Sequence, residues 1–181
     1  MSRAHSVVGV LLAAGAGTRY GIPKVLARQG EWLRVAVEAL ANGGCDDVVV
    51  VLGAAVVDVP LPARAVLAED WATGMSASLR AGLDAAGEAE LVVLHLVDTP
   101  DVGADVVTRV VGAAVSSSSG LARATYGGRP GHPVAVARRH RAALAATLHG
   151  DEGARTFLMG SRGVVFVECG DLATGLDVDE P

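Results

Sequence analysis

Five short runs of aliphatic residues are the feature that most constrains the fold of this chain. They cover 7–12, 48–52, 91–97, 134–136 and 164–167. The runs are almost continuously apolar, whereas a strand with one face in water alternates apolar and polar residues. They therefore predict strands that are covered on both faces, as in a mostly parallel sheet enclosed by helices.

Segments with a helical repeat separate these runs. Apolar side chains recur there every three or four positions, as on the buried face of a helix. The expected helices lie at 31–42, 75–86, 106–115 and 139–148. A further strand is expected at 121–126. The alternation predicts an α/β fold, a Rossmann-like three-layer sandwich with a mostly parallel sheet and helices on both faces. Since no long linker interrupts it, we expect one domain over residues 1–181.

Charge and hydropathy limit the partners of the chain. Its 15 Lys and Arg against 20 Asp and Glu give a formal net charge of −5. A net negative chain is unsuited to following a phosphate backbone, so no nucleic acid partner is expected. No apolar run reaches the roughly 18 residues of a membrane-spanning helix, and no basic amphipathic helix suits a membrane surface. We therefore expect no membrane partner.

The cysteines bear on the cellular compartment. Cys45 and Cys169 lie far apart and form no C-x-x-C pair, so neither a disulfide framework nor a zinc site is predicted. This favours a cytoplasmic protein. One alternative is a short secretory signal, because Arg3, the apolar run 7–14 and the sequence Ala14-Gly15-Ala16 resemble one. The residues that follow have a functional pattern instead, which favours the cytoplasm.

The loop after the first apolar run is the segment richest in chemistry. Residues 11–24 read LLAAGAGTRYGIPK. Small residues let a ligand approach the backbone, whose N–H groups can point at phosphate oxygens, and Arg19 and Lys24 add positive charge. The loop is neither a dinucleotide fingerprint, which needs glycine where Tyr20 stands, nor a Walker loop, which needs Ser or Thr after Lys24. It predicts a phosphate site, with a solvated glycine-rich turn as the alternative.

Three acidic residues are candidate magnesium ligands. Asp98 follows an apolar run, and ligands of open α/β sheets bind beyond the carboxyl ends of strands. Mg²⁺ takes one or two carboxylates and keeps several waters, although a turn cap is the alternative for Asp98. Asp177 and Asp179 would share one face of an extended strand, with a solvated tail as the alternative. His95, inside an apolar run, is expected to be a hydrogen-bonded core residue.

Six segments in order resemble the MobA-like nucleotidyltransferases, and within that superfamily they most resemble the molybdenum cofactor cytidylyltransferases. The signature loop is LAAGxGxRxGxPK, from Leu12 to Lys24. The other segments are GMSxSLxxGL from Gly74, VDxP from Val97, GHPV from Gly131, GDxGAR from Gly150 and DVDxP from Asp177. They cover almost the whole chain, and together they are far more specific than any one of them.

The resemblance implies a fold of the nucleotide-diphospho-sugar transferase type. It implies transfer of CMP from CTP to the terminal phosphate of molybdopterin or molybdenum cofactor, with Mg²⁺ and with release of pyrophosphate. Arg19, Lys24 and Asp98 would be catalytic, and Asp98 would bind the metal with Asp177 or Asp179. Nucleotide-binding residues would be Leu12, Ala13, Ala14, Gly15, Ala16, Gly17, Thr18, Arg19, Lys24, Gly74, Ser76 and Ser78. The acceptor would lie near His132, Asp151 and Arg155.

Several alternatives stay open. Ala13-Ala14-Gly15 and Pro23-Lys24 resemble cytidylyl members, whereas guanylyl members typically read Ala-Gly-Gly and Asp-Lys there, so CTP is favoured over GTP. Thr99 and Glu180 depart from the family pattern and bear on the acceptor more than on the transfer. Guanylyl transfer, another phosphate acceptor, and a non-catalytic nucleotide-binding regulator or cofactor chaperone are the alternatives. A molybdenum hydroxylase or its maturation factor is the implied protein partner.

Overall fold

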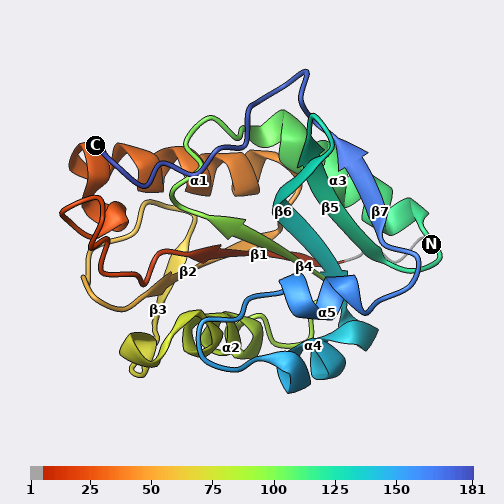
Figure 1. The fold of residues 1–181 in the computed structure, drawn as a ribbon, viewed down its shortest axis with the longest axis horizontal. Coiled ribbons are helices and arrows are strands. Elements are labelled where there is room, and N and C mark those ends of the chain that lie inside the picture. Colours follow the sequence, from red (N-terminus) through yellow and green to blue (C-terminus); the bar gives the residue numbers. More distant parts are fainter. Residues whose placement is uncertain (1–5) are drawn as a thin grey trace.

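A seven-stranded sheet lies between two layers of helices (Figure 1). The computed structural model describes residues 6–181. The strands are β1 (Val7–Leu12), β2 (Asp47–Leu52), β3 (Arg64–Leu67), β4 (Leu91–Leu96), β5 (Leu121–Tyr126), β6 (Arg129–Ala137) and β7 (Val165–Glu168). Their order is β3-β2-β1-β4-β6-β5-β7, and only β6 runs antiparallel to its neighbours β4 and β5. The expected mostly parallel sheet is confirmed.

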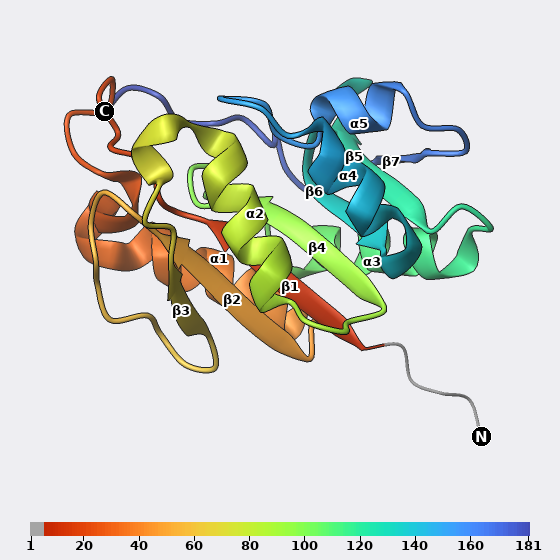
Figure 2. The same cartoon turned by 90° about the horizontal axis from the view of Figure 1, so that it is seen from below.

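Helices cover both faces of this sheet (Figures 1 and 2). One layer holds α1 (Glu31–Asn42) and α3 (Ala104–Ser116). The other layer holds α2 (Met75–Ala85), α4 (Arg141–Thr147) and α5 (Arg155–Met159). Short 3₁₀ helices lie at Lys24–Gly30, Trp71–Thr73 and Arg138–His140. The predicted three-layer sandwich is therefore confirmed, and no helix within residues 6–181 is long and apolar enough to cross a membrane.

The continuous apolar runs follow from two hydrophobic cores, one on each face of the sheet. On the interior strand β1, Leu11 belongs to the core under α1 and α3, and Val10 belongs to the core under α2. Both side chains are fully buried. Most of the run that resembles a secretory signal is thus β1, an interior strand of the sheet, and Arg3 lies outside the described residues.

Two strands differ clearly from the sequence predictions, and the short helix α5 is not among the four expected helices. Strand β3 was not predicted because it is short, lies at the sheet edge and exposes most of its residues, so it carries no apolar run. Strand β6 begins at Arg129 rather than near Pro133, because Gly127 and Gly128 turn the chain directly from β5 into β6. This hairpin brings the polar start of β6 to the carboxyl end of β4.

Close contact between α2 and β1 yields a stability prediction. A Cβ at Gly82 would collide with the buried side chain of Val10, whereas a Cβ at Gly112 on α3 would meet nothing within 4 Å. Overpacking costs about 1–3 kcal/mol, and replacing helical glycine by alanine returns up to about 1 kcal/mol. We expect Gly82→Ala to lower the free energy of unfolding in urea and Gly112→Ala to raise it. Equal effects of the two substitutions would contradict this packing.

Candidate active site

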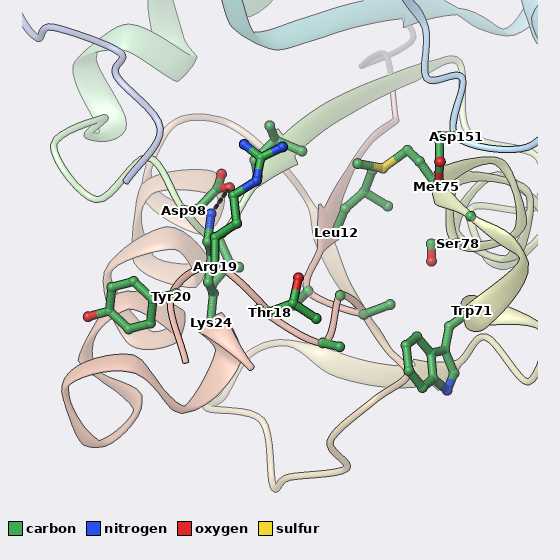
Figure 3. A pocket seen from close by; sticks show the side chains of 18 of the residues that line it. Leu12, Thr18, Arg19, Tyr20, Lys24, Trp71, Met75, Ser78, Asp98 and Asp151 are labelled. Atoms are coloured by element: carbon green, nitrogen blue, oxygen red, sulfur yellow. Dashed lines mark hydrogen bonds and ion pairs between the residues drawn. The ribbon is translucent and has the colours of Figure 1, made fainter. Parts of the chain in front are cut away.

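One cavity of about 400 Å³ opens at the carboxyl edge of β1 and β4 (Figure 3). It is formed by the loops that follow these two strands, the start of α2 and the C-terminal segment. Its lining comprises residues 12–20, Lys24, Trp71, Ala72, Gly74, Met75, Ser78, residues 96–98, Asp151 and Asp179. The structure thus brings most of the sequence-predicted site residues into one cavity.

The glycine-rich loop presents its backbone to this cavity. Gly17 has φ +62°, and a Cβ there would collide with the carbonyl oxygen of Ile22, so only glycine fits. The Gly17 carbonyl accepts a 2.8 Å hydrogen bond from the Gly21 N–H, which closes the turn. Within residues 6–181, no backbone hydrogen bond is donated by the N–H groups of residues 14–18. These groups are available to a ligand, as in other anion-binding loops.

An ion-pair cluster occupies one end of the cavity (Figure 3). The Lys24 Nζ donates hydrogen bonds of 2.8 Å to Asp98 Oδ2 and of 2.8 Å to Asp179 Oδ1. Arg19 adds an ion pair of 3.8 Å to Asp179, with its side chain 81% exposed. Burial alone would lower the pKa of Lys24, but hydrogen bonds to Asp179 and Asp98 outweigh it and hold that pKa above 10.5. The hydrogen bond from Lys24 also lowers the pKa of Asp179.

The C-terminal segment is fixed beside the loop after β4. The Val178 N–H donates to the Asp98 carbonyl at 2.9 Å, and the Thr174 N–H and hydroxyl both donate to Asp101 Oδ2. No strand forms from residue 169 onward, which corrects the expectation of an extended strand at the C-terminus. In this segment Asp179 lines the cavity, whereas Asp177 is exposed and does not line it.

The two serines at the start of α2 have different surroundings. Ser78 lines the cavity, as does Gly74. Ser76 does not line it, because its hydroxyl donates a 2.8 Å hydrogen bond to the Glu152 carbonyl and its N–H donates to the Gly150 carbonyl. Ser76 thus ties α2 to the loop before α5, and its contact with a nucleotide stays a prediction.

The acceptor residues expected from the family resemblance are also divided. Asp151 lines the cavity beside Met75 (Figure 3). His132, on β6, and Arg155, the first residue of α5, are not part of the lining. Of these three residues Asp151 alone lines the cavity, and the acceptor-binding roles of all three stay predictions.

The oxygen atoms of Asp98 and Asp179 suit a hard divalent cation. Asp98 Oδ1 is buried and has no hydrogen-bond partner among the described residues, so one hard oxygen donor is unused. No group of three or more His, Cys, Asp or Glu that could hold a metal occurs within residues 6–181. A pair of carboxylates fits Mg²⁺, which takes one or two protein carboxylates and completes its shell with water and phosphate.

His95 differs from its expected environment. It is completely buried, as predicted, but neither ring nitrogen has a hydrogen-bond partner within the described part of the chain. Burial, followed by the nearby His132, lowers the pKa of His95 to about 3. The ring is therefore neutral at physiological pH and acts as a packing group. The hydrogen bonds expected of His95 are absent from the described structure.

Two aromatic residues near the cavity were not assigned a role from the sequence. Trp71 is half-buried in the cavity wall, and a Cβ at Gly53 would lie 2.6 Å from its side chain. Tyr20 lines the cavity and packs its ring on Trp32 of α1, with centroids 5.2 Å apart. No spacing rule separates such residues from ordinary core aromatics, so the sequence carried no signal for them.

The Lys24–Asp179 pair predicts a pH-dependent difference in stability. The contribution of this ion pair to the free energy of unfolding is present above the ordinary carboxyl pKa of 3.8. It is lost as pH falls through the lowered pKa of Asp179. On the alkaline side it is present below 10.5 and is lost as pH rises through the raised pKa of Lys24. We expect Asp179→Asn to lower the melting temperature near neutral pH, with the difference from the unsubstituted protein vanishing in strong acid. The exposed neighbour variant Glu180→Gln should show no such pH-dependent loss.

Comparisons with known proteins agree with this architecture. A model of the MobA-like NTP transferase domain matches residues 9–164. Nicotine blue oxidoreductase of Paenarthrobacter nicotinovorans is 39% identical over 190 residues, which cover 96% of this chain and 92% of that protein.

Among solved structures, Rv0371c from Mycobacterium tuberculosis H37Rv is similar to this chain, with 27% sequence identity and a TM-score of 0.77. The match covers 98% of this chain and 95% of that chain. Rv0371C from the same organism in complex with manganese has 25% identity and a TM-score of 0.71, over 96% and 94% of the two chains. These matches span nearly the full length of each protein. The chain therefore belongs to the MobA-like NTP transferase family.

Proposed function

We propose that this protein transfers CMP from CTP to the terminal phosphate of molybdopterin or molybdenum cofactor and releases pyrophosphate. The observation that carries the proposal is the cavity in which Lys24 joins Asp98 and Asp179 beside a loop with free backbone N–H groups. Membership of a nucleotidyltransferase family supports the reaction class. The choice of CTP and of the acceptor rests on the family resemblance of residues 13–15 and 23–24.

The proposed reaction is an in-line displacement at the α-phosphorus of CTP. An oxygen of the acceptor phosphate attacks this phosphorus, the bond to the α–β bridging oxygen breaks, and pyrophosphate leaves with the electron pair. Both reactants are anions, so the protein mainly has to position them and neutralise their charge. In this proposal Arg19 and the N–H groups of residues 14–18 hold the triphosphate, and Lys24 stabilises charge on the α-phosphate. The nucleoside would contact the lining residues Gly74, Ser78 and Trp71.

Asp98 and Asp179 would hold a divalent cation in this scheme. The unused Oδ1 of Asp98 and the manganese complex of Rv0371C, a related protein, support such a site. When bound, Mg²⁺ would supply further charge neutralisation at the phosphates. Lys24 would then exchange its carboxylate partners for phosphate oxygens. We place this reaction in the cytoplasm, with a molybdenum hydroxylase or its maturation factor as recipient of the product.

Substitution of the half-buried carboxylate of Asp98 tests the chemistry. We expect Asp98→Asn to lower pyrophosphate release from CTP and molybdopterin by roughly 10²–10³-fold, because one preorganised charged group is lost. Asp58→Asn, at an exposed loop position outside the cavity, is the matched control and should keep the full rate. Full activity of Asp98→Asn would remove the metal assignment.

Ligand-induced stabilisation tests the choice of nucleotide. Any ligand that binds only the native state raises the melting temperature by mass action. We expect CTP with Mg²⁺ to raise it more than GTP with Mg²⁺. If GTP gives the larger increase, guanylyl transfer replaces cytidylyl transfer, and if neither has an effect at millimolar concentration the proposal fails. Binding without pyrophosphate release for every acceptor tried would support a regulator or cofactor chaperone.

The relative named nicotine blue oxidoreductase provides a second candidate, a redox reaction. Such a reaction needs a redox partner, of which a nicotinamide dinucleotide is one common kind. Tyr20 stands where the dinucleotide fingerprint requires glycine, which favours the nucleotidyl transfer instead. A direct comparison separates the two candidates. Reduction of nicotine blue by NADH or NADPH, together with no pyrophosphate release from CTP or GTP, would favour the oxidoreductase.

A further inference from the structure

A row of register partners extends from β4, the strand whose end lines the cavity, across the sheet to its far edge. Leu94 on β4 pairs with Val134 on β6, Val134 pairs with Arg123 on β5, and Arg123 pairs with Phe166 on β7. Paired residues of neighbouring strands point to the same face of a sheet. Leu94 and Val134 belong to the core under α2, α4 and α5, so Arg123 and Phe166 face that layer.

Arg123 reaches from this row toward the edge of the sheet at which the cavity opens. Its Nη2 donates a 3.2 Å hydrogen bond to the carbonyl of Gly131, the residue before His132. On the neighbouring strand β4, Leu96 lies two residues beyond Leu94 and lines the cavity. The backbone of Arg123 is two strands away from β4, but its guanidinium contacts β6, the strand next to β4, on the face and toward the edge where the acceptor region was expected.

The charge of Arg123 has no counter-ion in the described structure. Its Nε is buried without a hydrogen-bond partner, and no ion pair joins Arg123 or Arg155 to a carboxylate within residues 6–181. Burial, and after it the charge of Arg155 at the start of α5, lowers the pKa of Arg123. A desolvated, unpaired guanidinium is costly, and an arriving anion would offset this cost.

Phe166 gives this region an apolar side. Its side chain is 62% exposed although it is the register partner of the half-buried Arg123. An exposed aromatic ring beside a guanidinium suits a ligand that combines a planar organic part with an anionic group. Neither Arg123 nor Phe166 was among the residues expected to bind the acceptor.

We propose that Arg123 and Arg155 bind the phosphate monoester of the acceptor, and that Phe166 contacts the organic part of that molecule. This inference rests on the proposed function, because it assigns the acceptor side of the same site. The donors that Arg123 leaves free can form paired hydrogen bonds to phosphate oxygens, a geometry that lysine does not reproduce. The triphosphate of the nucleotide is the other possible source of such an anion, and the experiment separates the two.

The experiment uses the full chain and two simple probes, inorganic phosphate and phenyl phosphate, titrated without nucleotide and followed by ³¹P NMR. We expect Arg123→Met and Arg155→Met to weaken the binding of both probes by about 10- to 100-fold, the loss expected for a charged hydrogen bond. Arg162→Met, which removes another exposed arginine, is the matched control and should bind like the unsubstituted protein. Phe166→Ala should weaken phenyl phosphate while leaving inorganic phosphate unchanged.

A second measurement places the anion on the acceptor side. In Arg123→Met, Arg155→Met and Phe166→Ala, CTP with Mg²⁺ should raise the melting temperature as in the unsubstituted protein, and KM for molybdopterin should rise while KM for CTP stays constant. Arg162→Met should keep both KM values. Weaker CTP binding with unchanged phosphate binding would assign the cluster to the triphosphate and overturn the proposal. Absence of phenyl phosphate binding to the unsubstituted protein at millimolar concentration would also overturn it.

The test of this cluster depends neither on the folding of Arg123→Met nor on the outcome for the proposed function. If Arg123→Met does not fold, the exposed Arg155→Met carries the same expectation, since its side chain is not part of the core. Because the phosphate titration contains no nucleotide, failure of CTP turnover would refute the proposed function without deciding the outcome for this cluster.

Discussion

The site depends on a single ammonium group held between two carboxylates. Lys24 joins Asp98, which is 74 residues away in the chain, to Asp179, which is 155 residues away. Two carboxylates this close repel each other unless a cation lies between them, and the ammonium of Lys24 supplies it in this structure. The contact fixes the C-terminal segment, the loop after β4 and the glycine-rich loop at one point. Arg19 joins the same cluster through its 3.8 Å ion pair to Asp179.

The order of the strands explains why these three segments can meet. Strands β1 and β4 are parallel neighbours, with Leu12 opposite Leu96, although a long stretch of chain separates them. Their carboxyl ends therefore lie side by side at one edge, where ligands of open α/β sheets bind. The antiparallel strand β6 then brings residues near its own start to the same edge. The nucleotide side and the acceptor side can thus be parts of one continuous surface.

Local patterns predicted much of this arrangement, and long-range contacts explain what they missed. The strand Val7–Leu12 was predictable because burial on both faces requires a continuous run of aliphatic residues. The glycine-rich loop was predictable because close approach to the backbone favours glycine. The roles of Ser76 and Asp177 were not predictable, because a serine or an aspartate beside a site looks the same whether it points inward or bonds elsewhere. Arg123 lies in a mostly apolar strand, and only the pairing of β5 with β6 and β7 shows what surrounds it.

The sign of the net charge and the sign of the site charge are separate properties. The chain carries a net −5, yet Arg19, Lys24, Arg123 and Arg155 lie in or beside the region proposed for its two substrates. At physiological salt, exposed charges are screened beyond about 8 Å, so a small phosphate ester in the cavity interacts with the nearest cations rather than with the whole surface. A long polyanion would also contact the acidic remainder of the surface. Local cations on an acidic chain therefore favour small phosphate compounds over nucleic acids, which is the selectivity that a nucleotidyltransferase for a small acceptor requires.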